Sequence, residues 1–283
     1  MTRRTILREV TCEGVALHAG CRVQAALLPA AAGQGIVFRR SDLGGAEIPA
    51  RYDRVAETRL GTVIAEGPAS VGVIEHLMAA ISGAGIDDLI VSLDGPEPPI
   101  LDGDALSWLE LLDRAGAGEQ SGTRNALRLL RRVDVVRGDA SAALAPSDLL
   151  VLDFEIRFDS PAVGAQHLVW QFSPGAFRHD IAPARTFGFT HELDALHAAG
   201  LARGASLANT LAIGNGCIVN PGLMRFPDEF VRHKILDAMG DLALAGGALI
   251  ARFEGRHSGH ALNNALVRAV FSDAENYEVV ALS

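Results

Sequence analysis

Two stretches of the chain repeat apolar residues at the spacing of an α-helix. In Ser70–Gly83 the repeated apolar positions are Ile74, Leu77, Met78 and Ile81. In Asp228–Gly246 they are Val231, Ile235, Leu236, Met239 and Leu242. Apolar residues three or four positions apart lie on one face of a helix, so each stretch is predicted to be a helix with one buried face.

Shorter stretches of the chain predict strands, one further helix and a linker. Leu152–Asp159 alternates apolar and charged residues, which predicts a half-buried, antiparallel strand. Residues 3–30 are expected to form strands with a turn around His18, Asp88–Asp94 a short strand, and Ala105–Ala115 a helix. The segment 116–124 (GAGEQSGTR) is small, polar and without periodicity, so it is predicted to be a linker.

The same order of elements occurs in each half of the chain. A predicted helix leads through glycine to a short apolar strand, Leu89–Leu93 in the first half and Ala248–Phe253 in the second. The repeat predicts an α+β protein of two duplicated domains, 1–118 and 125–283, each a sheet covered by helices. Polar residues of the two helices would then meet at the interface between the domains.

The polar residues of both helices are of kinds that bind metal ions. At about 100° per residue, His76 falls opposite its apolar stripe and Glu75 on the flank. His233 and Asp237 lie one turn apart on the polar face of the second helix. Two histidines and an aspartate leave one coordination position for water, as in a catalytic zinc site, and a carboxylate next to a ligand is the natural base for that water.

A second interpretation stays open on these residues alone. A histidine opposite an apolar stripe is usually solvated, and a His–Asp pair one turn apart is usually a surface pair. The second helix also carries Asp241 one turn beyond Asp237, with Lys234 at the edge of the polar face. Taken alone, the polar residues of either helix favour the solvated interpretation. Taken together, and with Glu75 beside His76, the residues of both helices support a metal site and a solvated surface equally.

Two loops add candidate chemistry. His260 follows Gly259 after the last predicted strand and could act as a general acid or base, because its pKa lies near neutrality. Thr186 precedes Phe187 in a glycine-containing turn and could donate to a developing oxyanion. A solvated or capping histidine and a structural threonine are the alternatives. Other residues of these types are interpreted as structural or surface residues: His18, His167, His179, His191, His197, His257, Asp94, Asp102 and Asp104.

Composition narrows the partners and the compartment. A net charge of −9 argues against nucleic acid and against an anionic membrane surface as the main partner. Three cysteines without a CxxC motif are expected to be reduced thiols of a cytoplasmic protein. The N-terminus lacks the apolar run of a signal peptide, and the longest apolar run, Leu242–Ala251, is about half a membrane span. No integral membrane segment is therefore expected.

Six motifs make the chain similar to a known family. In the same order and at similar spacing, it resembles the zinc-dependent UDP-3-O-acyl-N-acetylglucosamine deacetylases of bacterial lipid A synthesis. The resemblance extends from residue 3 to about residue 270. The motifs are Gly14–His18 (GVALH), Glu75–Leu77 (EHL), Asp94–Gly103 (DGPEPPILDG), Ala184–Phe189 (ARTFGF), Asp228–Asp241 (DEFVRHKILDAMGD) and Ser258–Asn264 (SGHALNN).

The resemblance implies a ligand set and a base. It makes His76, His233 and Asp237 the ligands of Zn²⁺, and Glu75 the base that deprotonates the water at the metal. A His₂Asp set also accommodates Fe²⁺ or Co²⁺, so these ions stay possible.

It also implies roles around the metal. His260, oriented by Asp241, would stabilise charge and protonate the leaving amine. Thr186 would help to hold the oxyanion, and Lys234 would contact polar groups of the substrate.

The implied fold is a layered sandwich with one insertion in each half. The first insertion would add a small sheet, and the second, about 189–220, a passage for the acyl chain, with Phe187 and Leu207 as substrate-binding residues. Val73 stands where the family usually has a hydroxyl residue. Arg225 lies in a rearranged run, so no role is transferred to it.

The function implied is that of a cytoplasmic, monomeric zinc amidohydrolase. It would remove acetate from the 2-amino group of UDP-3-O-(3-hydroxyacyl)-N-acetylglucosamine, the committed step of lipid A biosynthesis. Two alternatives remain open: a related zinc deacylase of another N-acyl sugar nucleotide, and a non-catalytic metal- or lipid-binding descendant of the fold.

Overall fold

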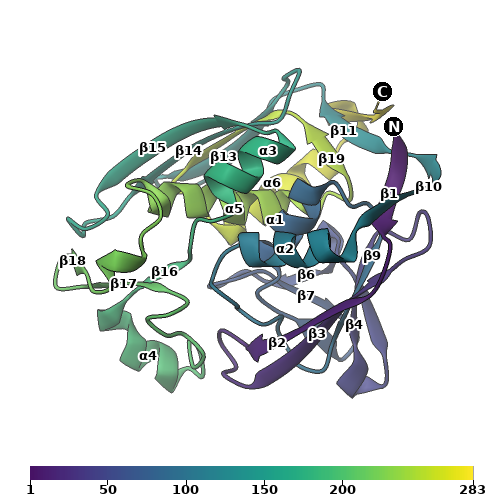
Figure 1. The fold of residues 1–283 in the computed structure, drawn as a ribbon. Helices are drawn as coiled ribbons and strands as arrows, with labels where there is room; N and C mark the ends of the chain where they lie inside the picture. The colour runs from purple at the N-terminus through teal and green to yellow at the C-terminus, as the bar shows by residue number, and fades with distance from the viewer. Residues whose placement is uncertain (283) are drawn as a thin grey trace.

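The computed structural model describes residues 1–282, and two five-stranded sheets form its framework (Figure 1). In the first sheet the central strand β9 (Leu89–Leu93) runs antiparallel to one neighbour and parallel to the other. In spatial order the strands are β2 (Val10–Val15), β3 (Arg22–Pro29), β9, β4 (Ile36–Arg40) and β5 (Ala46–Pro49).

The second sheet repeats this topology. Its central strand β20 (Arg252–Arg256) is antiparallel to one neighbour and parallel to the other. In spatial order the strands are β12 (Val133–Arg137), β13 (Ala140–Ala145), β20, β14 (Val151–Arg157) and β15 (Ala165–Gln171). Numbered by sequence within its half, each sheet has the order 1-2-5-3-4, so the α+β fold of two duplicated sheet-plus-helix domains is confirmed.

Helices fill the space between the two sheets (Figure 1). The first domain contributes α1 (Glu75–Ala84) and α2 (Leu106–Ala115), and the second α5 (Glu229–Ala243) and α6 (His260–Phe271). The core lies between these layers, with Trp108, Phe154 and Phe253 among its largest fully buried side chains. Each sheet therefore buries one face against helices. Within residues 1–282, no helix is both long and apolar enough to cross a membrane.

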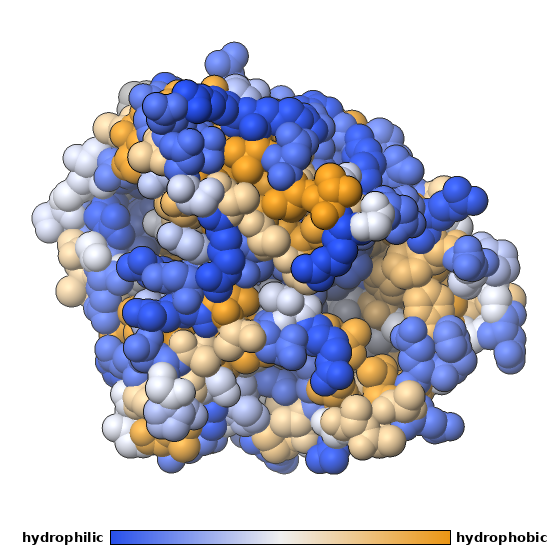
Figure 2. Space-filling view, turned by 180° about the vertical axis from the view of Figure 1, so that it is seen from behind, coloured by the Kyte–Doolittle hydropathy of each residue, from blue (hydrophilic) through white to orange (hydrophobic). Residues whose placement is uncertain are grey.

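Each domain carries an insertion between its fourth strand and its first long helix. The first insertion is a sheet of β6 (Val55–Glu57), β7 (Val63–Glu66) and β8 (Ala69–Val71). The second contains α3 (Pro174–Ala176), η3 (Phe177–Ile181), β16 (Phe187–Phe189), η4 (Thr190–Glu192), α4 (Leu193–Ala198), β17 (Leu211–Gly214), β18 (Cys217–Ile218) and η5 (Pro221–Leu223). In the view from behind, the surface is hollowed, with hydrophobic residues beside the hollow (Figure 2).

Three sequence predictions of local structure were wrong. The expected linker forms β10 (Ala117–Thr123), because it pairs antiparallel with the N-terminal strand β1 (Thr2–Ile6), with one irregularity between Thr2 and Arg3. The first ligand-bearing helix begins at Glu75, since Ser70 belongs to β8. The run after α5 is divided between two sheets: β19 (Ala248–Ile250) joins β11 (Asn125–Leu129) and β21 (Tyr277–Ala281), whereas β20 joins the main sheet.

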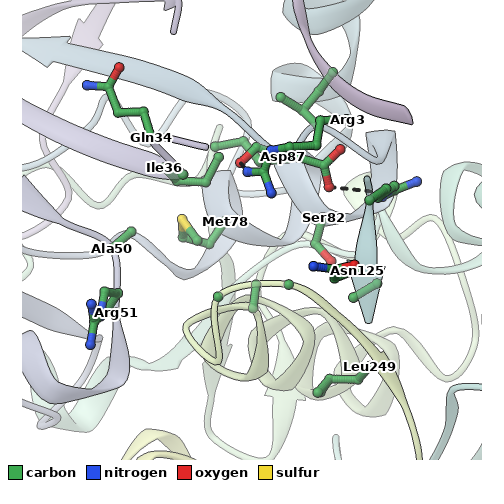
Figure 3. A pocket seen from close by; sticks show the side chains of 18 of the residues that line it. Arg3, Gln34, Ile36, Ala50, Arg51, Met78, Ser82, Asp87, Asn125 and Leu249 are labelled. Carbon is green, nitrogen blue, oxygen red and sulfur yellow. Dashed lines mark hydrogen bonds and ion pairs between the residues drawn. The ribbon is translucent and has the colours of Figure 1, made fainter. Parts of the chain in front are cut away.

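A cavity of about 420 Å³ lies between the two domains (Figure 3). Met78 of α1 and Leu249 of β19 both line it. The arginines around it are paired: Arg3 with Asp88, Arg124 with Asp87, and Arg51 with Asp53. Because each guanidinium has its own carboxylate, we interpret this cavity as part of the packing between the domains and not as an anion site.

Candidate active site

The candidate catalytic residues gather where α1 and α5 cross. Gly240 permits the close approach, because a Cβ at this position would lie 2.0 Å from the carbonyl oxygen of Glu75. Glu75 and His76 are only 3% and 5% exposed, and His76 faces Asp237 of the other domain. The interpretation of His76 as a solvated histidine is therefore wrong.

Three potential ligand atoms converge at this crossing. The Nε2 atoms of His76 and His233 lie 3.6 and 3.4 Å from Oδ1 of Asp237, and the two imidazole rings meet edge to face. All three side chains are buried, and their ligand atoms lie within 4.8 Å of one another. The interpretation of His233 and Asp237 as a surface pair is therefore also wrong.

The geometry and protonation of this set fit a tetrahedral cation. Bonds of 2.0–2.1 Å in a tetrahedron separate neighbouring ligand atoms by about 3.3–3.4 Å, close to the two observed spacings. Burial lowers the pKa of His233 to about 3, which keeps the imidazole neutral. Nδ1 of His233 lies 3.1 Å from the carbonyl oxygen of Ala184, so Nδ1 is the donor and the lone pair of Nε2 points to the ligand cluster.

Lys234 holds the other oxygen of the aspartate. Its Nζ donates to Oδ2 of Asp237 at 2.8 Å and lies over the ring of Phe187. Burial would raise the pKa of Asp237, but the charge of Lys234 and the contact with His76 hold this pKa well below its usual range. Asp237 is therefore a carboxylate whose Oδ1 is left to the ligand cluster.

Glu75 is fixed beside this cluster by the first insertion. Its Oε2 accepts a hydrogen bond from the backbone N–H of Thr62 at 3.0 Å, and Gly61 leaves room for Oε1. Burial raises the pKa of Glu75 above its usual range, and the neighbouring histidines oppose this. Val73, two residues before Glu75, has a φ of +53°, a strained conformation for a β-branched residue.

His260 stands on the other side of Glu75. Its Nε2 lies 3.8 Å from Oε1 of Glu75, and its Nδ1 donates to Oδ2 of Asp241 at 2.9 Å. Burial lowers the pKa of His260, but Asp241 and Glu75 outweigh burial and raise this pKa to about 10. The side chain is therefore an imidazolium at neutral pH in the metal-free protein.

Two cavities meet at the second insertion. One, of about 390 Å³, is lined by Glu75, His260 and the ligand cluster, and the other, of about 310 Å³, by apolar residues of the insertion. Thr186 and Phe187 line both cavities, whereas Leu207 lines only the second and is half exposed. All predicted site residues except Leu207 thus lie at or beside the first cavity.

Sequence reasoning missed several residues of the site. The hydroxyl of Thr62 donates to Oδ1 of Asp241 at 2.6 Å, and Nδ2 of Asn263 donates to Oδ2 at 2.8 Å. His18, interpreted as structural, lines the apolar cavity and accepts from the N–H of Ala202. Asn263 lies in a motif that drew attention only to His260, whereas no periodicity marks Thr62.

Comparison with known proteins identifies the family of the chain. The family model described as UDP-3-O-acyl N-acetylglycosamine deacetylase matches residues 3–272. A protein of Phenylobacterium zucineum (strain HLK1) named UDP-3-O-acyl-N-acetylglucosamine deacetylase is 45% identical over 282 residues, which are 99% of this chain and 96% of the relative. A relative of the same name from Anaeromyxobacter sp. (strain Fw109-5) is 45% identical, over 99% of this chain and 92% of the relative. Another, from Brucella melitensis biotype 2 (strain ATCC 23457), is 43% identical, over 98% of each chain. The chain therefore belongs to the UDP-3-O-acyl-N-acetylglucosamine deacetylase family, a family of hydrolases.

Proposed function

We propose that the protein is a zinc-dependent hydrolase that removes the N-acetyl group of UDP-3-O-acyl-N-acetylglucosamine and thereby acts in lipid A biosynthesis. The observation that carries the proposal is the convergence of His76, His233 and Asp237, with Glu75 and His260 beside them. The names of the relatives support the substrate. Fe²⁺ or Co²⁺ would suit the same three ligands.

In this proposal the protein side chains move the protons. When bound, Zn²⁺ would polarise the amide carbonyl and lower the pKa of water. Glu75 takes a proton from the attacking water as the new C–O bond forms, and Thr186 donates to the developing oxyanion. His260, held by Asp241, donates a proton to the amine nitrogen as the C–N bond breaks, which gives acetate and the free amine.

The apolar cavity supports an acyl chain as part of the substrate. Phe187 connects this cavity with the candidate catalytic centre, and Leu207 lines its wall. Each methylene that leaves water contributes on the order of 0.8 kcal/mol, so an acyl chain seated there would add substantially to affinity. Lys234 lines the cavity of the ligand cluster and lies over the ring of Phe187, where polar groups of the sugar nucleotide would face it. The cytoplasmic location and the monomeric state stay predictions.

Acetate release from defined substrates tests the proposal. We expect turnover of UDP-3-O-(3-hydroxyacyl)-N-acetylglucosamine, much slower turnover of UDP-N-acetylglucosamine, loss on chelation and recovery with one equivalent of Zn²⁺. Glu75→Gln should lose about 10²–10⁴-fold in rate while it keeps its metal content. Preference for another N-acyl sugar nucleotide would favour a related deacylase, and metal binding without turnover would favour a non-catalytic descendant.

A further inference from the structure

The segment from Pro183 to Thr186 is fastened at every residue. The carbonyl oxygen of Ala184 faces Nδ1 of the candidate ligand His233 at 3.1 Å. The N–H of Arg185 donates to Oε1 of Glu229 at 3.0 Å, and the N–H of Thr186 donates to the carbonyl oxygen of Gly103 in the other domain at 2.8 Å. Displacement of this segment would therefore move both the partner of His233 and the hydroxyl of Thr186.

Arg225 supplies the remaining link of this segment. Its Nη1 donates to the carbonyl oxygen of Pro183 at 2.7 Å and also to Oδ2 of Asp104 in the first domain. Its Nη2 lies 3.3 Å from Oδ2 of Asp102. One guanidinium thus joins the loop of the first domain to the peptide that precedes Ala184.

The backbone of Arg225 is tied to the helix that bears the ligands. Its N–H donates to Oε2 of Glu229 at 2.5 Å, and Glu229 is fully buried. Glu229 lies one turn before His233 on α5, so its carboxylate connects Arg225, Arg185 and the start of that helix. Arg225 therefore contacts the loop at Asp104, the peptide at Pro183 and the start of α5.

Asp104 is built to receive this arginine. Its side chain is 1% exposed, and while Oδ2 faces Arg225, Oδ1 accepts from the N–H and the hydroxyl of Ser107. One terminal nitrogen of the planar guanidinium donates to Asp104 and to the carbonyl oxygen of Pro183, while the other faces Asp102, and the compact ammonium of a lysine would reproduce only part of this fixed arrangement. Removal of Arg225 would leave a buried carboxylate without its cation, an arrangement that drives local rearrangement.

We propose that Arg225 and Asp104 form an interdomain strut that positions His233 and Thr186. They act as positioning residues: they touch neither the reacting atoms nor the metal, and they act through the Pro183–Ala184 peptide. This inference rests on the proposed function, because it assigns the strut to the candidate ligand set. It also gives a role to Asp104, which the sequence left as a structural or surface residue, and to Arg225, to which the family resemblance transferred no role.

A second interdomain ion pair provides the matched control. Arg178 of the second domain binds Asp113 of the first, but this pair is exposed and contacts neither His233 nor the peptide at Ala184. If joining the domains were the whole role of Arg225, loss of either pair would have similar consequences. If positioning is its role, only the Arg225 variants should affect the ligand cluster.

The experiment measures zinc affinity by competition with a chelator, together with kcat, KM and thermal unfolding, in the full-length protein. We expect Arg225→Gln and Asp104→Asn each to weaken zinc binding about 10–100-fold, as loss of outer-shell partners does, with a fall in kcat larger than any change in KM. Arg225→Lys should be intermediate. The double variant should resemble the worse single variant, because the two residues form one unit. Arg178→Gln should match the parent.

The outcomes are distinguishable from failure of the proposed function. Parent-like zinc affinity and kcat in Arg225→Gln and Asp104→Asn would overturn the strut, as would an equal loss in Arg178→Gln. If Arg225→Gln does not fold, Asp104→Asn decides, because Oδ1 can still accept from Ser107 in that variant. Unchanged zinc binding in His233→Ala would instead refute the metal site itself.

Discussion

Replacement of Asp241 by asparagine should move the basic limit of activity to lower pH. In the parent, Asp241 accepts from Nδ1 of His260 and, with Glu75, raises the pKa of His260 to about 10 against the effect of burial. The amide of asparagine can still accept the hydrogen bonds of His260 and Asn263, but it lacks the charge. Burial is then opposed mainly by Glu75, and the pKa of His260 should fall from about 10 toward its usual value of about 6.5.

The expected size follows from the protonated fraction of His260. The acid form is present below the pKa and lost as pH rises through it. At pH 8 about 99% of His260 is protonated with a pKa of about 10, but only about 3% with a pKa of about 6.5, so activity should fall about 30-fold at this pH and much less at pH 6. A bound divalent cation repels the imidazolium and lowers both limits, which leaves the direction of the change the same.

The assay is the pH dependence of kcat/KM for acetate release between pH 5.5 and 10. Asp153→Asn is the matched control, because Asp153 also pairs with a histidine, His167, at 2.8 Å but on the second sheet, far from the ligand cluster in sequence and outside the cavity. Its profile should keep the limits of the parent. A basic limit that is unchanged in Asp241→Asn would refute the assignment of His260 as the acid tuned by Asp241.

Three further predictions concern the ligands, the acyl chain and the helix crossing. His233→Ala and Asp237→Ala should each lower zinc affinity sharply, and full metal occupancy in both, measured by elemental analysis, would contradict the ligand assignment. Leu207→Glu should raise KM for acylated substrate more than for UDP-N-acetylglucosamine, because Leu207 lines the apolar cavity; its half-exposed position should let the variant fold. Equal kcat/KM across a series of acyl lengths in the parent would rule out a role for this cavity. Gly240→Ala should lower the free energy of unfolding by about 1–3 kcal/mol through overpacking and reduce kcat, whereas Gly175→Ala, where a Cβ would meet open space, should do neither.

Most of the candidate site could be predicted from the helical spacing of apolar and polar residues. This spacing placed His76 and Glu75 off the apolar stripe of one helix, and His233 and Asp237 one turn apart on another, where the structure has them on facing helices. It could not decide between solvent and a partner on the polar faces. That choice depends on Gly240, whose missing side chain lets the helices approach, and a single glycine inside a helix has no sequence signal of such a role.

The predictions that failed, and the residues that were missed, depend on contacts distant in sequence. The expected linker became β10 only because β1, more than a hundred residues earlier, pairs with it. Thr62 reaches Asp241, 179 residues later, and Arg225 reaches Asp104, 121 residues earlier. Local composition indicates no role for either residue, because their partners are brought to them only by the packing of the domains.

The duplicated framework explains how one site can be asymmetric. The equivalent helices α1 and α5 provide ligands from different turns: the first turn of α1 bears His76, and the second and third turns of α5 bear His233 and Asp237. Each insertion lies at the same point of its domain, but the two contribute different residues to the site. The first contributes Thr62, which contacts Glu75 and Asp241. The second contributes Thr186 and the wall of the apolar cavity. The symmetric layers thus fix where the two helices cross, and the insertions, which are free to differ, determine which chemistry and which substrate meet at the crossing.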